Sequence, residues 1–155
     1  LNHNLKQNQQ YLIVKLHPYE MRLFEDLHSN FSNITFLNND YLNQQDVDLY
    51  ELLGNTDFLI TDYSSIYFDY LTIDKPIIFL TNYLQQYEEK RGLLMGPYED
   101  VVPGICVKTQ QELLEALDKP DQFQQKRHYW LNLSNQVQAE SNCENVVKLM
   151  KNIRG

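Results

Sequence analysis

Cysteine is scarce in this sequence: Cys106 and Cys143 are the only two among 155 residues. So few cysteines indicate two reduced thiols in a cytosolic protein, not a disulfide framework. Nor does any His/Cys spacing suggest a metal site. The closest carboxylate pair, Asp46 and Asp48, stands at an expected helix start. We therefore expect no metal ion.

Glycine-rich motifs and long apolar runs are missing as well. Neither G-x-G-x-x-G nor G-x-x-x-x-G-K-[ST] occurs, so a nicotinamide-binding or P-loop protein has no support. A G-x-S-x-G nucleophile elbow is also absent, which argues against a Ser-His-Asp hydrolase. No apolar stretch is long enough to cross a bilayer, and no signal peptide opens the sequence.

Positive charge is in deficit, with 13 Lys and Arg against 21 Asp and Glu and a net charge of −8. This balance argues against a broad nucleic-acid or anionic-membrane surface, so a phosphate ligand would have to be bound locally. The length fits a single domain over residues 1–155 with a real core. Leu1 as first residue, followed by the polar run "NHNLKQNQQ", suggests a fragment of a larger protein.

What the sequence does contain is an alternation of strand and helix patterns. Apolar, β-branched runs predict strands at 11–16, 33–37, 57–61, 75–81 and 105–109. Helical spacing predicts helices at 19–30, 46–56, 64–74, 110–118, 120–133 and 142–153, and residues 82–104 a short helix with a long ordered loop. Such alternation is typical of a parallel sheet covered on both faces. We predict an α/β domain with a doubly wound parallel sheet of roughly five or six strands.

Polar residues follow the third predicted strand, "DFLIT", where a helix is expected to begin. In doubly wound sheets, ligands bind beyond the carboxyl ends of the strands. A helix start offers free N–H groups and a partial positive charge, and Ser64 and Ser65 add small hydroxyl donors there. The alternative is that one serine only caps the helix. Asp62 can orient a ligand hydroxyl or fix the turn by an Asx-type hydrogen bond, and we favour the turn.

The first predicted strand also ends in polar residues, Lys15 and His17. His17 can donate to a phosphate oxygen or stabilise a leaving phosphate as charge develops. The alternative is a histidine with a purely structural role. His3, His28 and His128 lack a comparable context and are expected at the surface.

Arg91 and Gly92, in the long segment after the fourth strand, form the best candidate for a mobile cation. An arginine can clamp a phosphate through two parallel hydrogen bonds, and glycine lets the backbone approach closely. The alternative is a solvated charge run, Glu-Glu-Lys-Arg, at a helix end.

Four segments resemble, in order, the C-terminal half of the CDP-glycerol glycerophosphotransferases, a bacterial family that builds teichoic acids and some capsular polymers. They are "KLHP", "FLITDYSSIYFDYLTIDKPIIFL", "YEEKRG" and "PGICVKTQQEL", within residues 11–117. The ordered combination of "TDYSS", "FD", "KP", "RG" and "PG" is specific, whereas each element alone is weak. Asp69 and Lys75 match positions of these motifs, and we interpret both as structural.

The resemblance implies a GT-B fold of two Rossmann-like domains, of which this chain is the donor-nucleotide half. It implies that His17 contacts the donor pyrophosphate, that Ser64 and Ser65 hold phosphate, and that Arg91 lies near the donor. The implied reaction is attack by a polymer-terminal hydroxyl on the glycerol-linked phosphate of CDP-glycerol, or a related CDP-polyol, with release of CMP. Positive side chains and helix dipoles supply the charge stabilisation in such a site, so we expect no tightly bound cofactor.

Two departures from the family pattern limit what the resemblance implies. Members usually carry Asp-Gly just before Ala-Ser near the last helix, whereas this sequence has "NQVQAESNCENVV", in which Ser141 is the matching position. The family's N-terminal domain, which supplies the acceptor side and the catalytic base, is not in the sequence. We therefore expect this chain to bind donor without turning it over.

The resemblance also implies a cytoplasmic enzyme at the inner face of the cell membrane. Because this sequence is acidic and has no apolar anchor, we expect membrane contact only through other parts of the full-length protein. Two alternatives remain: half of a GT-B nucleotide-sugar transferase or epimerase, or a non-catalytic α/β binding module. A receiver-type module needs an acidic pair where this chain has Lys15 and His17.

Overall fold

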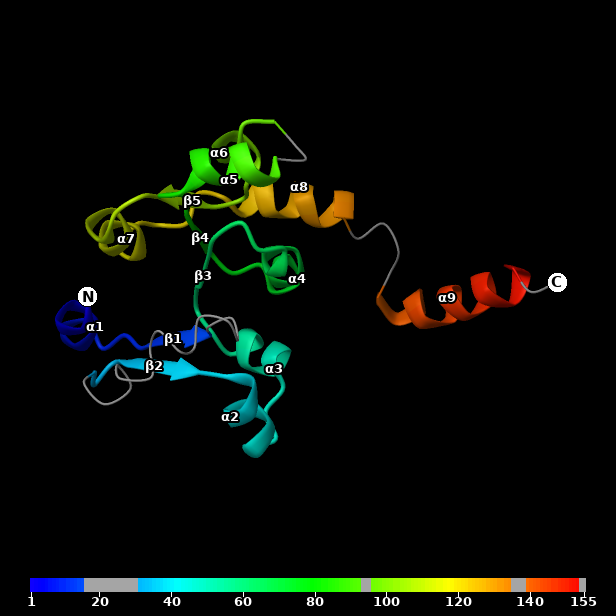
Figure 1. The fold of residues 1–155 in the computed structure, drawn as a ribbon, viewed down its shortest axis with the longest axis horizontal. Coiled ribbons are helices and arrows are strands. Elements are labelled where there is room, and N and C mark those ends of the chain that lie inside the picture. The colour runs from blue at the N-terminus through cyan, green and yellow to red at the C-terminus, as the bar shows by residue number, and fades with distance from the viewer. Residues whose placement is uncertain (16–30, 93–95, 135–138, 154–155) are drawn as a thin grey trace. The chain divides into compact units, whose positions relative to one another are not determined.

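The computed structural model describes residues 1–15, 31–92, 96–134 and 139–153. Strands and helices alternate along this part of the chain (Figure 1). Its strands are β1 Leu12–Lys15, β2 Ile34–Leu37, β3 Leu59–Thr61, β4 Ile77–Leu80 and β5 Ile105–Val107. All five predicted strands are confirmed, and so is the α/β class with parallel strand pairs. The predicted helix at 19–30 lies outside the described residues.

The helices match most of the predictions and add three. The predicted ones are α3 Leu49–Gly54, α4 Ile66–Tyr70 continued by the 3-10 turn η3 Leu71–Ile73, α5 Leu84–Arg91, α7 Gln110–Leu117, α8 Gln124–Ser134 and α9 Ala139–Ile153. Helices α1 Asn2–Gln7 and α2 Asn39–Gln44 were not predicted, and α6 Tyr98–Val101 lies where a loop was expected. Helices α1 and α2 each bury one apolar residue, Leu5 or Leu42, so neither shows the periodic apolar pattern on which the predictions rest.

The described chain divides into two compact units. The first comprises Leu1–Asp57 and Val107–Lys119. Its strands β1 and β2 pair in parallel, from Leu12 beside Ile34 to Lys15 beside Leu37 (Figure 1). Strand β1 is only partly buried, with Ile13 41% exposed. The buried Asn33 joins α1 to the start of this sheet: its backbone N–H donates to Asn2 Oδ1 and its side chain donates to the Gln10 carbonyl.

The second unit comprises Phe58–Cys106 and Pro120–Gly155. Its sheet has the order β3-β4-β5, and β3 runs parallel to β4. The central strand β4 is a continuous apolar run in which Ile77, Ile78 and Phe79 are at most 1% exposed, as expected for a strand buried on both faces. Beside it, Gly104 has no room for a side chain, because a Cβ atom there would lie 2.1 Å from the Ile77 carbonyl oxygen.

Neither Cys106, which is partly buried, nor Cys143, which is exposed, forms a disulfide within the described part of the chain. No helix in the described part of the chain has the length and apolar character needed to span a membrane.

Candidate functional site

Residues 62–65 connect strand β3 to helix α4, and we call them the strand-end turn. Within it, the Ser64 N–H donates to Asp62 Oδ1 at 3.1 Å. This hydrogen bond closes an Asx turn, which lets the chain leave the strand and enter the helix in four residues. The local role expected for Asp62 is therefore confirmed. All three polar side chains of the turn, those of Asp62, Ser64 and Ser65, are exposed.

The serines do not act as a conventional helix cap. Ser65 is the N-cap residue of α4, yet its side chain makes no capping hydrogen bond. Ser64 Oγ accepts from the Ile66 N–H only at 3.4 Å, which is long for a hydrogen bond of this kind. Helix capping therefore does not explain why a serine stands at position 65. Asp69 lies in the first turn of α4, where a carboxylate is favoured by the helix dipole, in line with its expected structural role.

Three tyrosines hold the strand-end turn against the segment that follows β4. The Tyr63 ring stacks on Tyr87 of α5 at a centroid distance of 4.2 Å and meets Tyr98 of α6 edge-on at 5.4 Å. The Tyr98 hydroxyl donates to the Asp62 carbonyl at 2.8 Å. Sequence reasoning missed all three, because they come from separate segments and share no spacing that would link them.

Burial disfavours ionisation of two of these phenols. It raises the pKa of the Tyr63 phenol above its ordinary value, and it raises the pKa of Tyr98 further. The neighbouring Tyr67 of α4 is raised by burial to a pKa of about 12. A phenol with an ordinary pKa of about 10 is already protonated at neutral pH, and the raised pKa lets the Tyr98 hydroxyl keep donating to the Asp62 carbonyl at higher pH as well.

Arg91 is the last residue of α5 and is exposed. Its guanidinium carbon lies 6.0 Å from the centroid of the Tyr87 ring, the same ring on which Tyr63 stacks. Gly92 ends the helix at φ 71°, a left-handed conformation that favours glycine. The second unit thus links Arg91 to the strand-end turn through one tyrosine pair. The exposed position of Arg91 at the end of the Glu-Glu-Lys-Arg run also fits the alternative, a solvated charge run at a helix end.

The remaining predicted site residues lie elsewhere. Lys15 ends β1 in the first unit, partly buried. His17 lies outside the described residues. Ser141 falls within helix α9. Within the described ranges, no group of three or more His, Cys, Asp or Glu side chains is placed to hold a metal ion.

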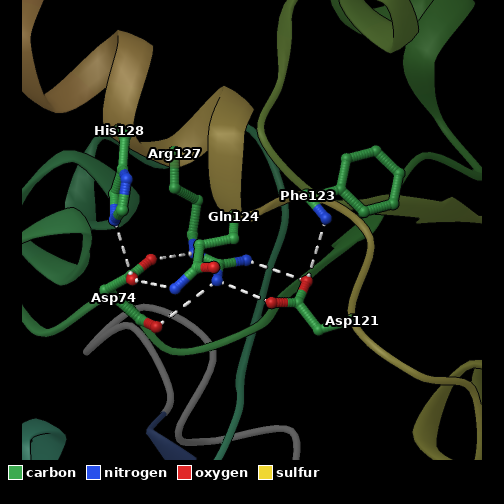
Figure 2. Close-up of polar contacts among 6 residues, drawn as sticks. All are labelled: Asp74, Asp121, Phe123, Gln124, Arg127 and His128. Atoms are coloured by element: carbon green, nitrogen blue, oxygen red, sulfur yellow. Dashed lines mark hydrogen bonds and ion pairs between the residues drawn. The ribbon is translucent and has the colours of Figure 1, made fainter.

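A second group of polar side chains, the Arg127 cluster, lies around the start of α8 and comprises Asp74, Asp121, Gln124, Arg127 and His128 (Figure 2). Arg127 is 1% exposed and donates through Nε to Asp74 Oδ1 at 2.9 Å. Its two terminal nitrogens donate to the Asp121 carboxylate at 2.9 and 2.6 Å. The planar guanidinium suits this two-pronged pairing, which an ammonium group could not reproduce.

The charges of the Arg127 cluster compensate one another. Hydrogen bonding from Arg127 holds the pKa of Asp121 below its ordinary value. Burial raises the pKa of Asp74, but hydrogen bonds from Gln124, Arg127 and His128 outweigh that effect and leave this pKa lowered. His128 is 54% exposed, which confirms the surface position expected for it, although it contacts Asp74 Oδ2 at 2.9 Å. No sequence signal pointed to this cluster, because Asp74 and Arg127 are 53 residues apart.

Comparison with known proteins identifies the family. The family model for CDP-glycerol:poly(glycerophosphate) glycerophosphotransferase matches residues 1–152. This chain belongs to that family. The resemblance read from the residues is confirmed, and the match extends beyond residues 11–117 to include α1, α8 and most of α9.

Individual relatives carry names from teichoic acid synthesis. The chain is 29% identical over 154 residues to the teichoic acid glycerol-phosphate primase of Bacillus subtilis (strain 168), covering 99% of this chain and 37% of that protein. It is 36% identical to the primase of the same name from Bacillus spizizenii, over 80% of this chain and 30% of that one. The chain thus spans only about a third of the length of these relatives.

A solved structure supports the fold. A variant of the wall teichoic acid polymerase TagF soaked with CDPG superimposes with a TM-score of 0.73 at 23% identity, over 98% of this chain and 37% of that one. At this identity the likeness establishes a shared fold.

Proposed function

We propose that this chain is the donor-binding part of a transferase that uses CDP-glycerol, or a related CDP-polyol, in the synthesis of a teichoic-acid or capsular polymer. The observation that carries the proposal is the family match over residues 1–152. The exposed serine pair at the carboxyl end of β3 adds to it, since ligands of parallel α/β sheets bind beyond strand ends. In this proposal the chain is one Rossmann-like half of a GT-B enzyme and forms a single donor-binding domain.

The proposed reaction is a displacement at phosphorus. The terminal hydroxyl oxygen of the acceptor polymer forms a bond to the glycerol-linked phosphorus of the donor. The bond from that phosphorus to the oxygen bridging to CMP breaks, and CMP leaves with the electron pair. The hydroxyl proton passes to a base in the rest of the enzyme, so the isolated chain binds donor without turning it over.

Each site residue has a proposed role in stabilising the charge of the two phosphates. Ser64 and Ser65 donate hydroxyl hydrogen bonds to phosphate oxygens at the start of α4, and Arg91 supplies a positive charge from the end of α5. His17 contacts the pyrophosphate and assists departure of CMP.

The other proposed contacts are secondary. Lys15 adds positive charge, Asp62 keeps the strand-end turn in shape, Gly92 lets the backbone approach the donor, and Ser141 contacts its nucleotide end. In the cell we propose that the full-length enzyme works at the inner face of the membrane, with membrane contact made by its other parts.

Thermal unfolding of the chain with and without CDP-glycerol tests the proposal. A ligand that binds only the folded state at about 100 times its Kd adds roughly 2.7 kcal/mol, which for this size raises the Tm by several degrees. CDP-glycerol and CMP should give this shift, and UDP-glucose should not. We expect Ser64→Ala and His17→Ala to abolish it.

Ser134→Ala is a matched control, because among the described residues Ser134 in α8 bonds to carbonyls of its own helix, those of Trp130 and Leu131. This variant should keep the full shift. An unchanged Tm for the unsubstituted chain at saturating CDP-glycerol would contradict donor binding. A shift with UDP-glucose alone would point to a nucleotide-sugar enzyme instead.

A further inference from the structure

Helix α8 contacts two segments that each meet the strand-end turn: the helical segment that follows it in sequence, and α6, which contacts it from farther along the chain. On one side it packs against α4 and η3, which follow the turn in sequence. On the other it bonds to α6, which reaches the turn through Tyr98. All of these elements belong to the second compact unit.

The first connection passes through Asp74. This residue directly follows η3, and η3 continues α4 without a break, so the stretch from Ile66 to Ile73 is one short helical segment that begins at the strand-end turn. Arg127 holds the residue after its far end, donating to the Asp74 carboxylate at 2.9 Å and to its backbone carbonyl at 3.3 Å. Trp130 adds an edge-on contact with Phe68 in the middle of the segment. Fixing the far end therefore limits the directions that the first turn of α4 can take.

The second connection passes through α6. Trp130 Nε1 donates to the Val101 carbonyl and Lys126 Nζ to the Asp100 carbonyl, which holds the end of α6 against α8. At the start of α6, the Tyr98 hydroxyl donates to the Asp62 carbonyl at 2.8 Å. One helix is thus connected to both ends of the strand-end turn.

One guanidinium holds both the side chain and the backbone of Asp74. Asp74 ends the helical segment at φ 49° and ψ 37°, a left-handed conformation that aspartate adopts more readily than most residues with a side chain. Arg127, for its part, is 1% exposed, and a buried guanidinium is stable only while its carboxylate partners remain in place. Because Arg127 bonds to both the carboxylate and the carbonyl of Asp74, loss of Arg127 releases both groups at once.

From these contacts we propose that Arg127 is a positioning residue for the strand-end turn: by holding Asp74 it fixes α4 in the direction that donor phosphate requires. This inference rests on the proposed function of the turn. It assigns Arg127 no contact with the donor, since the four hydrogen bonds that its guanidinium makes among the described residues all go to Asp74 and Asp121.

The test compares Arg127→Lys with a variant that is destabilised elsewhere in the same unit, Ile78→Ala. A lysine retains the charge but cannot bridge two carboxylates, whereas Ile78 is a 1% exposed residue of β4 outside both connections. Affinity for CDP-glycerol is measured by calorimetry at a temperature where every variant is folded. Hydrogen exchange is measured at the amides of Ser64, Ile66 and Phe68.

We expect Arg127→Lys to weaken CDP-glycerol binding about tenfold, while Ile78→Ala stays within about twofold of the unsubstituted chain. The three amides should exchange faster in Arg127→Lys than in Ile78→Ala. Equal affinities and equal exchange rates in the two variants would overturn the proposal, since loss of stability alone would then explain everything.

A milder variant covers the case in which Arg127→Lys does not fold. Asp121→Asn removes one of the two charges paired with Arg127 and leaves Asp74 intact, so a smaller effect in the same direction is expected. If the unsubstituted chain fails to bind CDP-glycerol, the proposed function of the turn is wrong for this chain. Hydrogen exchange then decides the positioning role alone: faster exchange than in Ile78→Ala supports it, and equal exchange overturns it.

Discussion

The strand-end turn and the Arg127 cluster are both polar and belong to the same compact unit, yet they use their polar groups in opposite ways. In the cluster, a guanidinium that is 1% exposed is paired with two carboxylates. In the turn, Asp62, Ser64 and Ser65 are exposed, and the Ser65 side chain makes no capping hydrogen bond. Buried polar groups must satisfy one another, whereas exposed ones can remain available to a ligand.

This difference separates stability from binding. Removing one member of a buried charge network leaves its partners without compensation, which costs several kcal/mol. Removing an exposed hydroxyl has almost no effect on folding. Substitutions in the turn should therefore weaken donor binding with little effect on unfolding, whereas substitutions in the cluster should lower the free energy of unfolding strongly and weaken donor binding only through the position of α4.

The largest effect should come from Arg127→Met. This change leaves the carboxylates of Asp74 and Asp121 without their cation, and because each is still 27% exposed we expect the free energy of unfolding to fall by about 1.5–3 kcal/mol. Urea unfolding followed by circular dichroism measures it. Arg91→Met is the matched control, since Arg91 is exposed and should change stability by less than about 1 kcal/mol. Similar losses in the two variants would mean that burial does not distinguish the two arginines.

Acid should remove part of the same stabilisation. The folded-state pKa values of Asp74 and Asp121 lie below their ordinary values, so both groups favour the folded state above their unfolded pKa of about 4. Their contribution is lost as the pH falls from about 4 through the lowered folded values. We therefore expect the stability difference between the unsubstituted chain and Arg127→Met to shrink as urea titrations move from pH 6 to pH 2.5.

Asp121→Asn provides the control for this pH series. It removes one of the two titrating groups, so the change in stability between pH 6 and pH 2.5 should be smaller than in the unsubstituted chain. An identical pH dependence would mean that carboxylates outside the Arg127 cluster cause the acid sensitivity.

The sequence predicted the strand-end turn because the signals there are local. An apolar run, "DFLIT", followed at once by Asp62, Ser64 and Ser65 marks a strand end and a helix start within a few residues. The Asx hydrogen bond joins residues only two positions apart. Contacts between residues so close in sequence can be predicted without knowing how the strands and helices pack.

The Arg127 cluster and the tyrosine contacts could not be predicted in the same way. Arg127 and Asp74 meet across 53 residues, and Tyr98 reaches Asp62 across 36. Such pairs depend on how the elements pack, which the order of strands and helices leaves open. Helix α2 is a different case: Asn38 caps it at 2.6 Å, a local signal that an apolar-periodicity search passes over.

An intermediate effect should follow from Tyr98→Phe. The substitution removes the hydroxyl that donates to the Asp62 carbonyl and keeps the ring that meets Tyr63, so we expect a loss of about 1 kcal/mol. Because burial raises the pKa of Tyr98, this loss should be the same at pH 7 and pH 9. Tyr87→Phe, which keeps the stacked ring, is the control and should change stability by a few tenths of a kcal/mol at most. A loss that disappears by pH 9 would argue against a neutral, donating phenol.

The smallest effect on stability should come from Ser65→Ala, and here the comparison between the two regions is sharpest. A serine that caps a helix contributes about 1 kcal/mol, but the Ser65 side chain makes no capping hydrogen bond. We expect urea unfolding to differ from that of the unsubstituted chain by less than about 0.5 kcal/mol. Calorimetry on the same sample should show weaker binding of CDP-glycerol. A loss near 1 kcal/mol with unchanged binding would instead make Ser65 a capping residue and remove it from the proposed donor site.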